Sequence, residues 1–230
     1  MPTETHDRHA ENALVVTSPS QFPTVDCHRF EANAPVAVDH AFDAHHAEVN
    51  GPLSVDGPMN VHHCDCNGPL GVMGPLNVHH LDVDGSVGVE GPTSCHELDL
   101  DGAGQFADLH AETISVSGAL EATDCSAETV SLDGALDCDQ LDASHITLRL
   151  SGESAVRRID ADELTVTRRQ PDGFLVADTI TADHLSLEHT EVTTVEGDHV
   201  TIGPGCHVQL LRASEYEIDD AATVDEKEAY

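Results

Sequence analysis

A stretch of fifteen residues occurs twice in this chain, and the second copy starts seventeen residues after the first. "VNGPLSVDGPMNVHH" covers residues 49–63, and "CNGPLGVMGPLNVHH" covers residues 66–80. Glycine recurs at one fixed position of six successive units, at Gly51, Gly68, Gly85, Gly102, Gly118 and Gly134. The period is 17 residues and then 16. A chain that repeats so short a unit at a nearly fixed period folds by stacking one unit on the next.

Each unit divides into two pieces of six residues and one of five, with apolar residues at the first and third positions of each piece. Leu81 and Val83 form one such pair, and Val87 and Val89 form the next. Side chains two residues apart on a strand face the same way. Gly-Pro pairs such as Gly51-Pro52 follow at once, and proline belongs at corners because it lacks a ladder donor. Each unit therefore predicts three short strands joined by tight bends.

These features predict an all-β fold, a single-stranded parallel β-helix. We expect a triangular solenoid with 16–18 residues per rung and roughly nine to ten rungs. A helical fold is excluded, because each glycine inside a helix costs about 1 kcal/mol. Right-handed winding is expected from the general preference of parallel crossovers. We expect a flexible tail over 1–13, the β-helix over 14–212, and an acidic tail over 213–230.

The composition is strongly acidic, with 43 Asp and Glu against 9 Lys and Arg and a formal net charge of -34. Such a charge opposes a compact state through self-repulsion. At about 1 M salt the Debye length falls to about 3 Å, and most of this repulsion is screened. The composition is therefore typical of a protein from a salt-accumulating halophile such as a haloarchaeon. Nucleic acid is not expected as a partner, because no basic surface is available to displace counterions from phosphates.

The apolar segments and the cysteines indicate where the protein works. No apolar run approaches the roughly 20 residues of a membrane span, and the start "MPTETHDRHAENA" lacks the regions of a signal peptide. We expect a cytoplasmic protein without direct membrane insertion, which reaches a membrane only through a partner protein. The seven cysteines show no C-x-x-C spacing. Four of them replace apolar residues of the repeat and are expected in the core: Cys64, Cys66, Cys95 and Cys138.

Histidines recur in register with the repeat. His45, His62, His79 and His96 share one position of the unit, and His46, His63 and His80 share the next. Stacked rungs would place them about 5 Å apart at one corner. One interpretation is a metal site, since imidazole binds zinc and γ-class carbonic anhydrases hold a metal by histidines on a solenoid. The other is a ladder of packed imidazoles, which we expect because the histidines recur evenly. No catalytic residue, metal ligand or cofactor is assigned.

Four arginines cluster where the rungs become irregular. They are Arg157, Arg158, Arg168 and Arg169. These arginines either neutralise nearby acids or form a docking patch for an acidic partner.

The segment "EGDHVTIGPGCHVQLL" (196–211) carries a hexapeptide-like phrase near the end of the repeats. With the short rungs and the acidic tail, the chain resembles the bactofilins, and most of all their haloarchaeal relatives, the halofilins. The resemblance covers about residues 15–212. It implies a cytoskeletal protein whose β-helices join end to end into nucleotide-independent filaments that help to set cell shape. The chain departs from the bacterial pattern because it has no apolar or basic membrane-targeting tail.

The two ends of a β-helix expose unpaired N–H and C=O groups, which proteins either cap or use. If they are used, the self-association residues are expected to be Val15, Val16, Val208, Leu210 and Leu211. We expect a structural protein rather than an enzyme. The alternative is a hexapeptide-solenoid enzyme, either an acyltransferase or a metal enzyme. Acyltransferases of that type carry a long excursion from the coil, whereas the excursions expected here are short.

Overall fold

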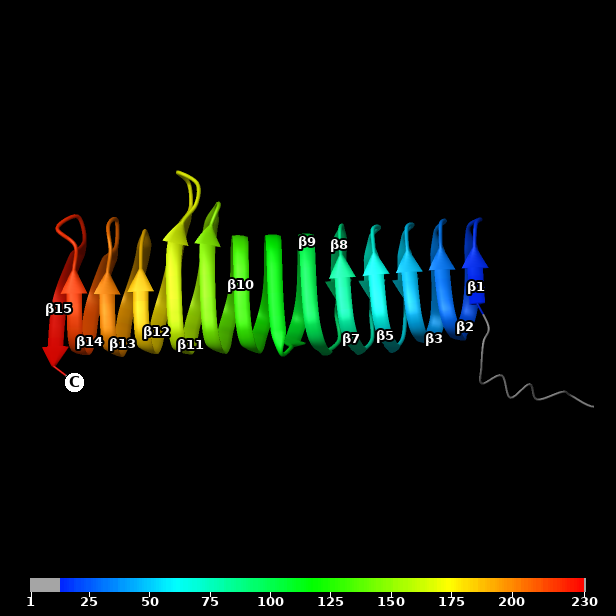
Figure 1. Cartoon of the computed structure of the whole chain (residues 1–230), viewed down its shortest axis with the longest axis horizontal. Coiled ribbons are helices and arrows are strands. Elements are labelled where there is room, and N and C mark those ends of the chain that lie inside the picture. The colour runs from blue at the N-terminus through cyan, green and yellow to red at the C-terminus, as the bar shows by residue number, and fades with distance from the viewer. Residues whose placement is uncertain (1–12, 230) are drawn as a thin grey trace, which may run out of the picture.

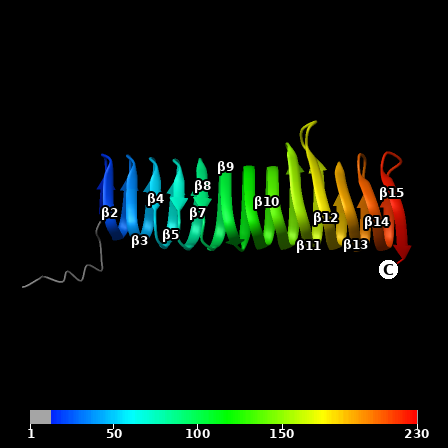
Figure 2. The same cartoon turned by 180° about the vertical axis from the view of Figure 1, so that it is seen from behind.

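The computed structural model describes residues 13–229; the N-terminal tail expected over 1–13 lies outside this range except for Ala13. The fold is all-β: one parallel sheet of 15 strands winds into a β-solenoid of about 13 turns. The coils follow one another along a single axis, with β1 and β15 at opposite ends of the rod (Figures 1 and 2). The predicted fold class is therefore confirmed. None of the described residues forms a helix that could cross a membrane.

The strands vary in length because several of them run through the corners without a break. Their bounds are β1 (Ala13–Val16), β2 (Ser20–Ala32), β3 (Val36–Val49), β4 (Leu53–Val55), β5 (Met59–Cys66), β6 (Leu70–Val72), β7 (Leu76–Val83), β8 (Ser86–Val89), β9 (Thr93–His110), β10 (Thr113–Leu150), β11 (Glu153–Arg168), β12 (Phe174–Leu187), β13 (Thr190–Ile202), β14 (His207–Ile218) and β15 (Thr223–Ala229).

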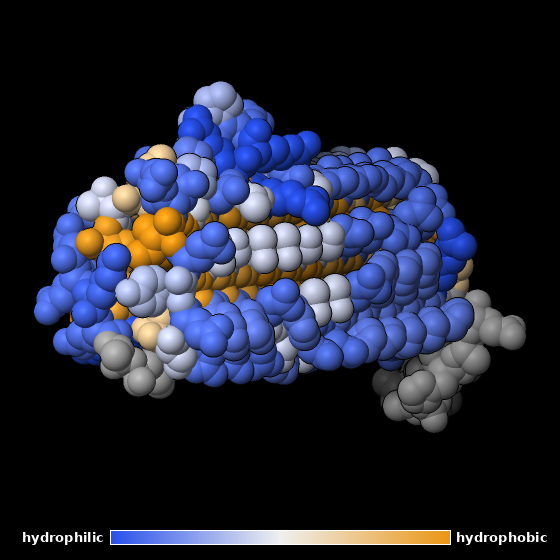
Figure 3. Space-filling model, turned by 60° about the vertical axis from the view of Figure 1, so that its left-hand side comes forward, coloured by the Kyte–Doolittle hydropathy of each residue, from blue (hydrophilic) through white to orange (hydrophobic). Residues whose placement is uncertain are grey.

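Each coil places six side chains inside the rod, two from each of three faces. In one coil these are Leu53, Val55, Met59, Val61, Cys64 and Cys66, all of them buried. The strands pair in parallel with the preceding coil, so equivalent residues stack in columns; Met59, for example, lies between Phe42 and Leu76. Figure 3 shows the result on the surface, where narrow apolar strips lie between rows of polar side chains. Three inward pairs in each coil make the coil three-sided, as predicted.

Glycine is required at the corners, where successive coils approach closely. A Cβ at Gly118, whose φ is +147°, would lie 2.0 Å from the carbonyl oxygen of Gly102. A Cβ at Gly134 would meet the carbonyl oxygen of Gly118 at 1.7 Å. Side chains at these positions are excluded by the backbone of the neighbouring coil, and this explains why glycine recurs at one fixed position.

The number of coils and the C-terminal boundary differ from the prediction. About 13 turns are present instead of nine or ten. The segment expected to be an acidic tail continues the solenoid, because β14 runs to Ile218 and β15 pairs with it, Val208 with Val224. The period also varies more than expected. It reaches 21 residues between Glu153 and Phe174, where the loop 169–173 projects from the rod (Figure 1).

Candidate functional site

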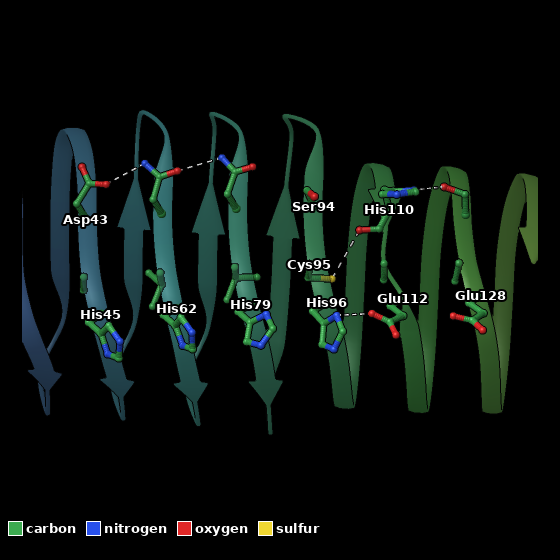
Figure 4. Close-up of a pocket in the computed structure, with 18 of the residues that line it drawn as sticks. Asp43, His45, His62, His79, Ser94, Cys95, His96, His110, Glu112 and Glu128 are labelled. Atoms are coloured by element: carbon green, nitrogen blue, oxygen red, sulfur yellow. Dashed lines mark hydrogen bonds and ion pairs between the residues drawn. The ribbon is translucent and has the colours of Figure 1, made fainter.

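A groove runs along one face of the rod, and its form follows from strand alternation. Asn60 and His62 point outward on either side of Val61, whose side chain points inward and is 5% exposed. Small residues in the column of Val61 form a low floor, including Val78, Cys95, Ala111, Ala127 and Ala143. Between the two outward rows the groove has a volume of about 1300 Å³. Figure 4 shows both rows of side chains along its length.

The first wall of the groove is a ladder of imidazoles from successive coils. His28, His45, His62, His79 and His96 stack with ring centroids 4.7 to 4.8 Å apart. The predicted ladder is therefore present, and His28 extends it by one coil. His96 ends it by contacting the carboxylate of Glu112, which occupies the same row in the next coil (Figure 4).

The second wall is a row of amides, hydroxyls and carboxylates. Asn60 donates to Asp43 at 2.9 Å, and Asn77 donates to Asn60 at 3.0 Å. Further along, Nδ1 of His110 lies 2.8 Å from Oγ of Ser126. The sequence analysis missed His110, which stands outside the histidine register. The position of His110 in this row is recognised only when the 16-residue coils are aligned with one another.

The second histidine column contacts acids rather than lining the groove. Nε2 of His63 lies 3.2 Å from Asp65, and Nδ1 of His80 lies 3.0 Å from Glu97. Burial, together with repulsion from Asp84, Asp99 and Asp65, raises the pKa of Asp82 despite the opposing effect of His80.

Within residues 13–229, no three His, Cys, Asp or Glu side chains are arranged to hold a metal ion. The groove offers instead a periodic series of hydrogen-bonding groups.

The cysteines lie in the core, as the repeat predicted. Cys64, Cys66, Cys95 and Cys138 are buried. Burial raises the pKa of Cys66 to about 11, although a hydrogen bond with the backbone of Gly68 lowers it. Burial raises the pKa of Cys95 to about 12. At neutral pH these thiols are protonated and contribute to packing as small apolar groups.

The four arginines named from the sequence lie in two separate pairs. Arg157 and Arg158 occupy one corner, where Arg157 donates to Asp139 at 2.7 Å and Arg158 donates to Asp160 at 2.5 Å.

The second pair lies beside the projecting loop. Arg168 donates to the carbonyl of Gln170 at 2.9 Å, and Arg169 pairs with Asp133. The structure does not bring the two pairs together into one patch.

At the N-terminal end of the described residues, the partner of β1 within 13–229 is β2 alone. Val15 points outward and is 53% exposed, whereas Val16 points inward and is 5% exposed. Leu14, in register with Phe30, is half-buried in the outermost coil.

At the C-terminal end, Val208, Leu210 and Leu211 lie one coil further inside than expected. β15 covers them, pairing Leu210 with Glu226 and Leu211 with Lys227, and Val208 and Leu211 are buried. The outermost coil instead contains Tyr216, whose ring centroid lies 5.4 Å from Nζ of Lys227. Sequence reasoning missed these two residues because acids surround them.

Two curated proteins of Bacillus subtilis (strain 168) are similar to parts of this chain. "Uncharacterized protein YhbE" is 34% identical over 96 residues, which cover 37% of this chain and 40% of the relative. "Uncharacterized protein YhbF" is 40% identical over 83 residues, 34% of each chain. The chain thus spans well under half the length of these relatives. No family model and no solved structure matches it.

Proposed function

We propose that this chain is a structural protein that assembles end to end into nucleotide-independent filaments and helps to maintain cell shape. The observation that carries the proposal is the strand pairing at the two ends. Among residues 13–229, β1 pairs only with β2 and β15 pairs only with β14, so within this part of the chain each outermost coil has one unpaired edge. An unpaired parallel edge is a template for another chain with the same coil.

The regularity of the rod supports the same proposal. Equivalent side chains stack from coil to coil over about 13 turns. A second copy would continue most of these columns, although Tyr216 and Lys227 interrupt two of them at the C-terminal end. The first coil favours this joint, because three of its inward residues, Leu14, Val16 and Phe22, are apolar.

The acidic composition supports the proposal that the assembly works in a salt-rich cytoplasm, as in a halophilic archaeon. At a net charge of -34, copies would repel one another in dilute buffer. Any contact with a membrane is proposed to pass through a partner protein.

The test is negative-stain microscopy in about 2–3 M KCl, where the Debye length is below about 3 Å. Leu14→Lys puts a charge into the exposed interior of the first coil, and it should abolish filaments. Val15→Lys adds the same charge to the neighbouring outward position, and filaments should persist. Filaments of the same length in both variants, or none in the wild type, would contradict the proposal. Circular dichroism checks that both variants keep the solenoid.

A further inference from the structure

A second surface of the rod has one outward row that carries no charge over four successive coils. This row consists of Ala37, Ser54, Gly71 and Gly88, which lie in register on β3, β4, β6 and β8. Beside this row the exposed prolines Pro35, Pro52 and Pro69 border an apolar groove of about 740 Å³. We call these residues, together with Met73, the proline face. On a chain with net charge -34, it is a place where another acidic molecule can approach.

The repeat itself marks one coil of this face. The two fifteen-residue copies differ at four positions. Two differences lie inside the rod, where Val49 becomes Cys66 and Met59 becomes Leu76. The other two point outward, and both lie on the proline face: Ser54 becomes Gly71 and Asp56 becomes Met73. The outward surface of this coil is therefore flatter and more apolar than that of the preceding coil.

Nothing inside the rod requires glycine at 71 or 88. A Cβ built on either residue meets no atom within 4 Å. By contrast, a Cβ at the corner residue Gly74 would lie 2.5 Å from the backbone of Gly57. Glycine in a strand weakens the strand, and it commonly marks a place where another backbone approaches.

Met73 is the second unusual residue here. Its side chain is 53% exposed, whereas the equivalent positions of the neighbouring coils hold the acids Asp39, Asp56 and Glu90. Gly71 thus has an exposed methionine two residues after it and an exposed proline, Pro69, two residues before it.

We propose that the proline face binds the same face of a second copy, with the two rods side by side and parallel. A two-fold axis along the rods, passing at Gly71, places Met73 of each copy against Pro69 and Leu70 of the other. The arrangement is isologous, so each copy contributes both the methionine and the groove. Gly71 lets the two backbones come close at the centre.

The coil spacing favours a second copy as the partner. A second stack of the same coils keeps its side chains in step with this face from one coil to the next, because both repeat at about 4.8 Å.

Charge decides the direction of the second copy. In an antiparallel pair centred on Gly71, Asp56 would face Glu90. In the parallel pair Asp56 faces Pro52 and Glu90 faces Ser86, so acids avoid one another. The face is about 19 Å long and about 13 Å wide, less than the roughly 800 Å² per partner of a stable complex. We therefore expect weak, reversible association.

The test is sedimentation equilibrium of the full chain carrying Leu14→Lys, which should block end joining, in about 2–3 M KCl and up to millimolar concentration; all further variants are made in this background. The double variant Gly71→Ser/Met73→Asp gives this coil the outward residues of the preceding one, which the fold already accommodates at Ser54 and Asp56. We expect its dimerisation to be at least tenfold weaker. The matched control Leu76→Met copies an interior difference and should leave the dimer unchanged. A Leu14→Lys parent that stays monomeric, or a double variant that dimerises equally well, would overturn the proposal.

The direction and the independence from end joining are tested separately. The variant Ser54→Cys should form a disulfide between its two copies under mild oxidation, because a parallel pair brings equal residue numbers together. An antiparallel pair would place position 54 opposite Gly88, and the lack of a disulfide would contradict the parallel arrangement. Leu14→Lys, which should block end joining, should leave the side-by-side dimer intact. Loss of both assemblies in Leu14→Lys would show that the ends, not the proline face, make the dimer.

Discussion

The imidazole ring of His62 lies on that of His45, with the centroids 4.8 Å apart and the planes 4° from parallel. This contact is a consequence of the coil register, which places identical side chains one above the other. His79 lies on the other side of His62, again with the centroids 4.8 Å apart but with the planes tilted by 46°. A middle ring such as His62 therefore has an imidazole neighbour on each side.

Protonation of neighbouring imidazoles in this ladder should destabilise the rod, because like charges on stacked rings repel one another. Two charges 4.8 Å apart in water-like surroundings repel by about 1 kcal/mol. The melting temperature should therefore fall between pH 7.5 and pH 5, and more at low salt than at high salt. The variant His45→Asn/His62→Asn/His79→Asn should lose part of this difference, because it removes three rings of one ladder and leaves the second stacked column of His46, His63 and His80 in place. Asparagines stack compatibly with the coils, since Asn77 donates to Asn60 on the neighbouring row. The prediction would be refuted if the melting temperature changed between pH 7.5 and pH 5 by the same amount in the wild type and the variant.

Gly118 and Gly71 should respond in opposite ways to alanine. At Gly118 the new Cβ would meet the carbonyl oxygen of Gly102 at 2.0 Å, and φ is +147°. Gly118→Ala should cost about 3 kcal/mol of the free energy of unfolding. Gly71→Ala has open space and should change it by less than about 1 kcal/mol, in the stabilising direction. Urea denaturation of both variants measures the difference, and equal effects would contradict the structure.

The buried thiols predict a loss of stability at alkaline pH. Burial raises the pKa of Cys66, Cys138 and Cys206 to about 11. Between the ordinary thiol pKa, about 8.5, and these raised values, the unfolded chain has lost protons that the folded chain keeps, so stability falls as pH rises. The urea midpoint should be constant from pH 7 to 8 and should fall between pH 9 and 10.5. Cys66→Val copies the neighbouring coils and should reduce the fall, and an unreduced fall would contradict this assignment.

The sequence allowed the coil to be predicted because inward pairs and corner glycines repeat. Leu53 and Val55 point inward for the same reason as Leu70 and Val72. The end coils could not be counted in the same way, because Tyr216 and Lys227 occupy positions that hold Val200 and Leu211 one coil earlier. A charged residue at an inward position interrupts the apolar pattern from which the period is recognised in the sequence.

The groove was only partly predictable. The even spacing of the histidines was enough to place the ladder that starts from His45. The second wall was not found, because its row changes from Asn77 to Ser94 and then His110, and the period shortens by one residue. The proline face could have been found by comparing the two repeat copies, since Gly71 and Met73 are their outward differences.

Lys227 closes the C-terminal coil in a way that the N-terminal coil lacks. It is the only lysine of the chain, and it lies in register with the buried Leu211. Its ammonium group lies 5.4 Å from the centre of the Tyr216 ring. An inward-pointing charge at the edge of a sheet discourages another strand from pairing there. Residues 215–228 also carry seven carboxylates, so this end repels an identical end.

Replacing Lys227 by leucine should therefore promote joining at the C-terminal end. Lys227→Leu restores an apolar column above Leu211, and its copies should associate more strongly than the wild type in about 2–3 M KCl. The gain should shrink in dilute buffer, where the seven carboxylates are not screened. Light scattering against salt concentration measures the association, with Lys227→Arg as the control that keeps the inward charge. If Lys227→Leu and Lys227→Arg scatter alike at every salt concentration, the lysine does not protect this end, and the carboxylates alone oppose joining there.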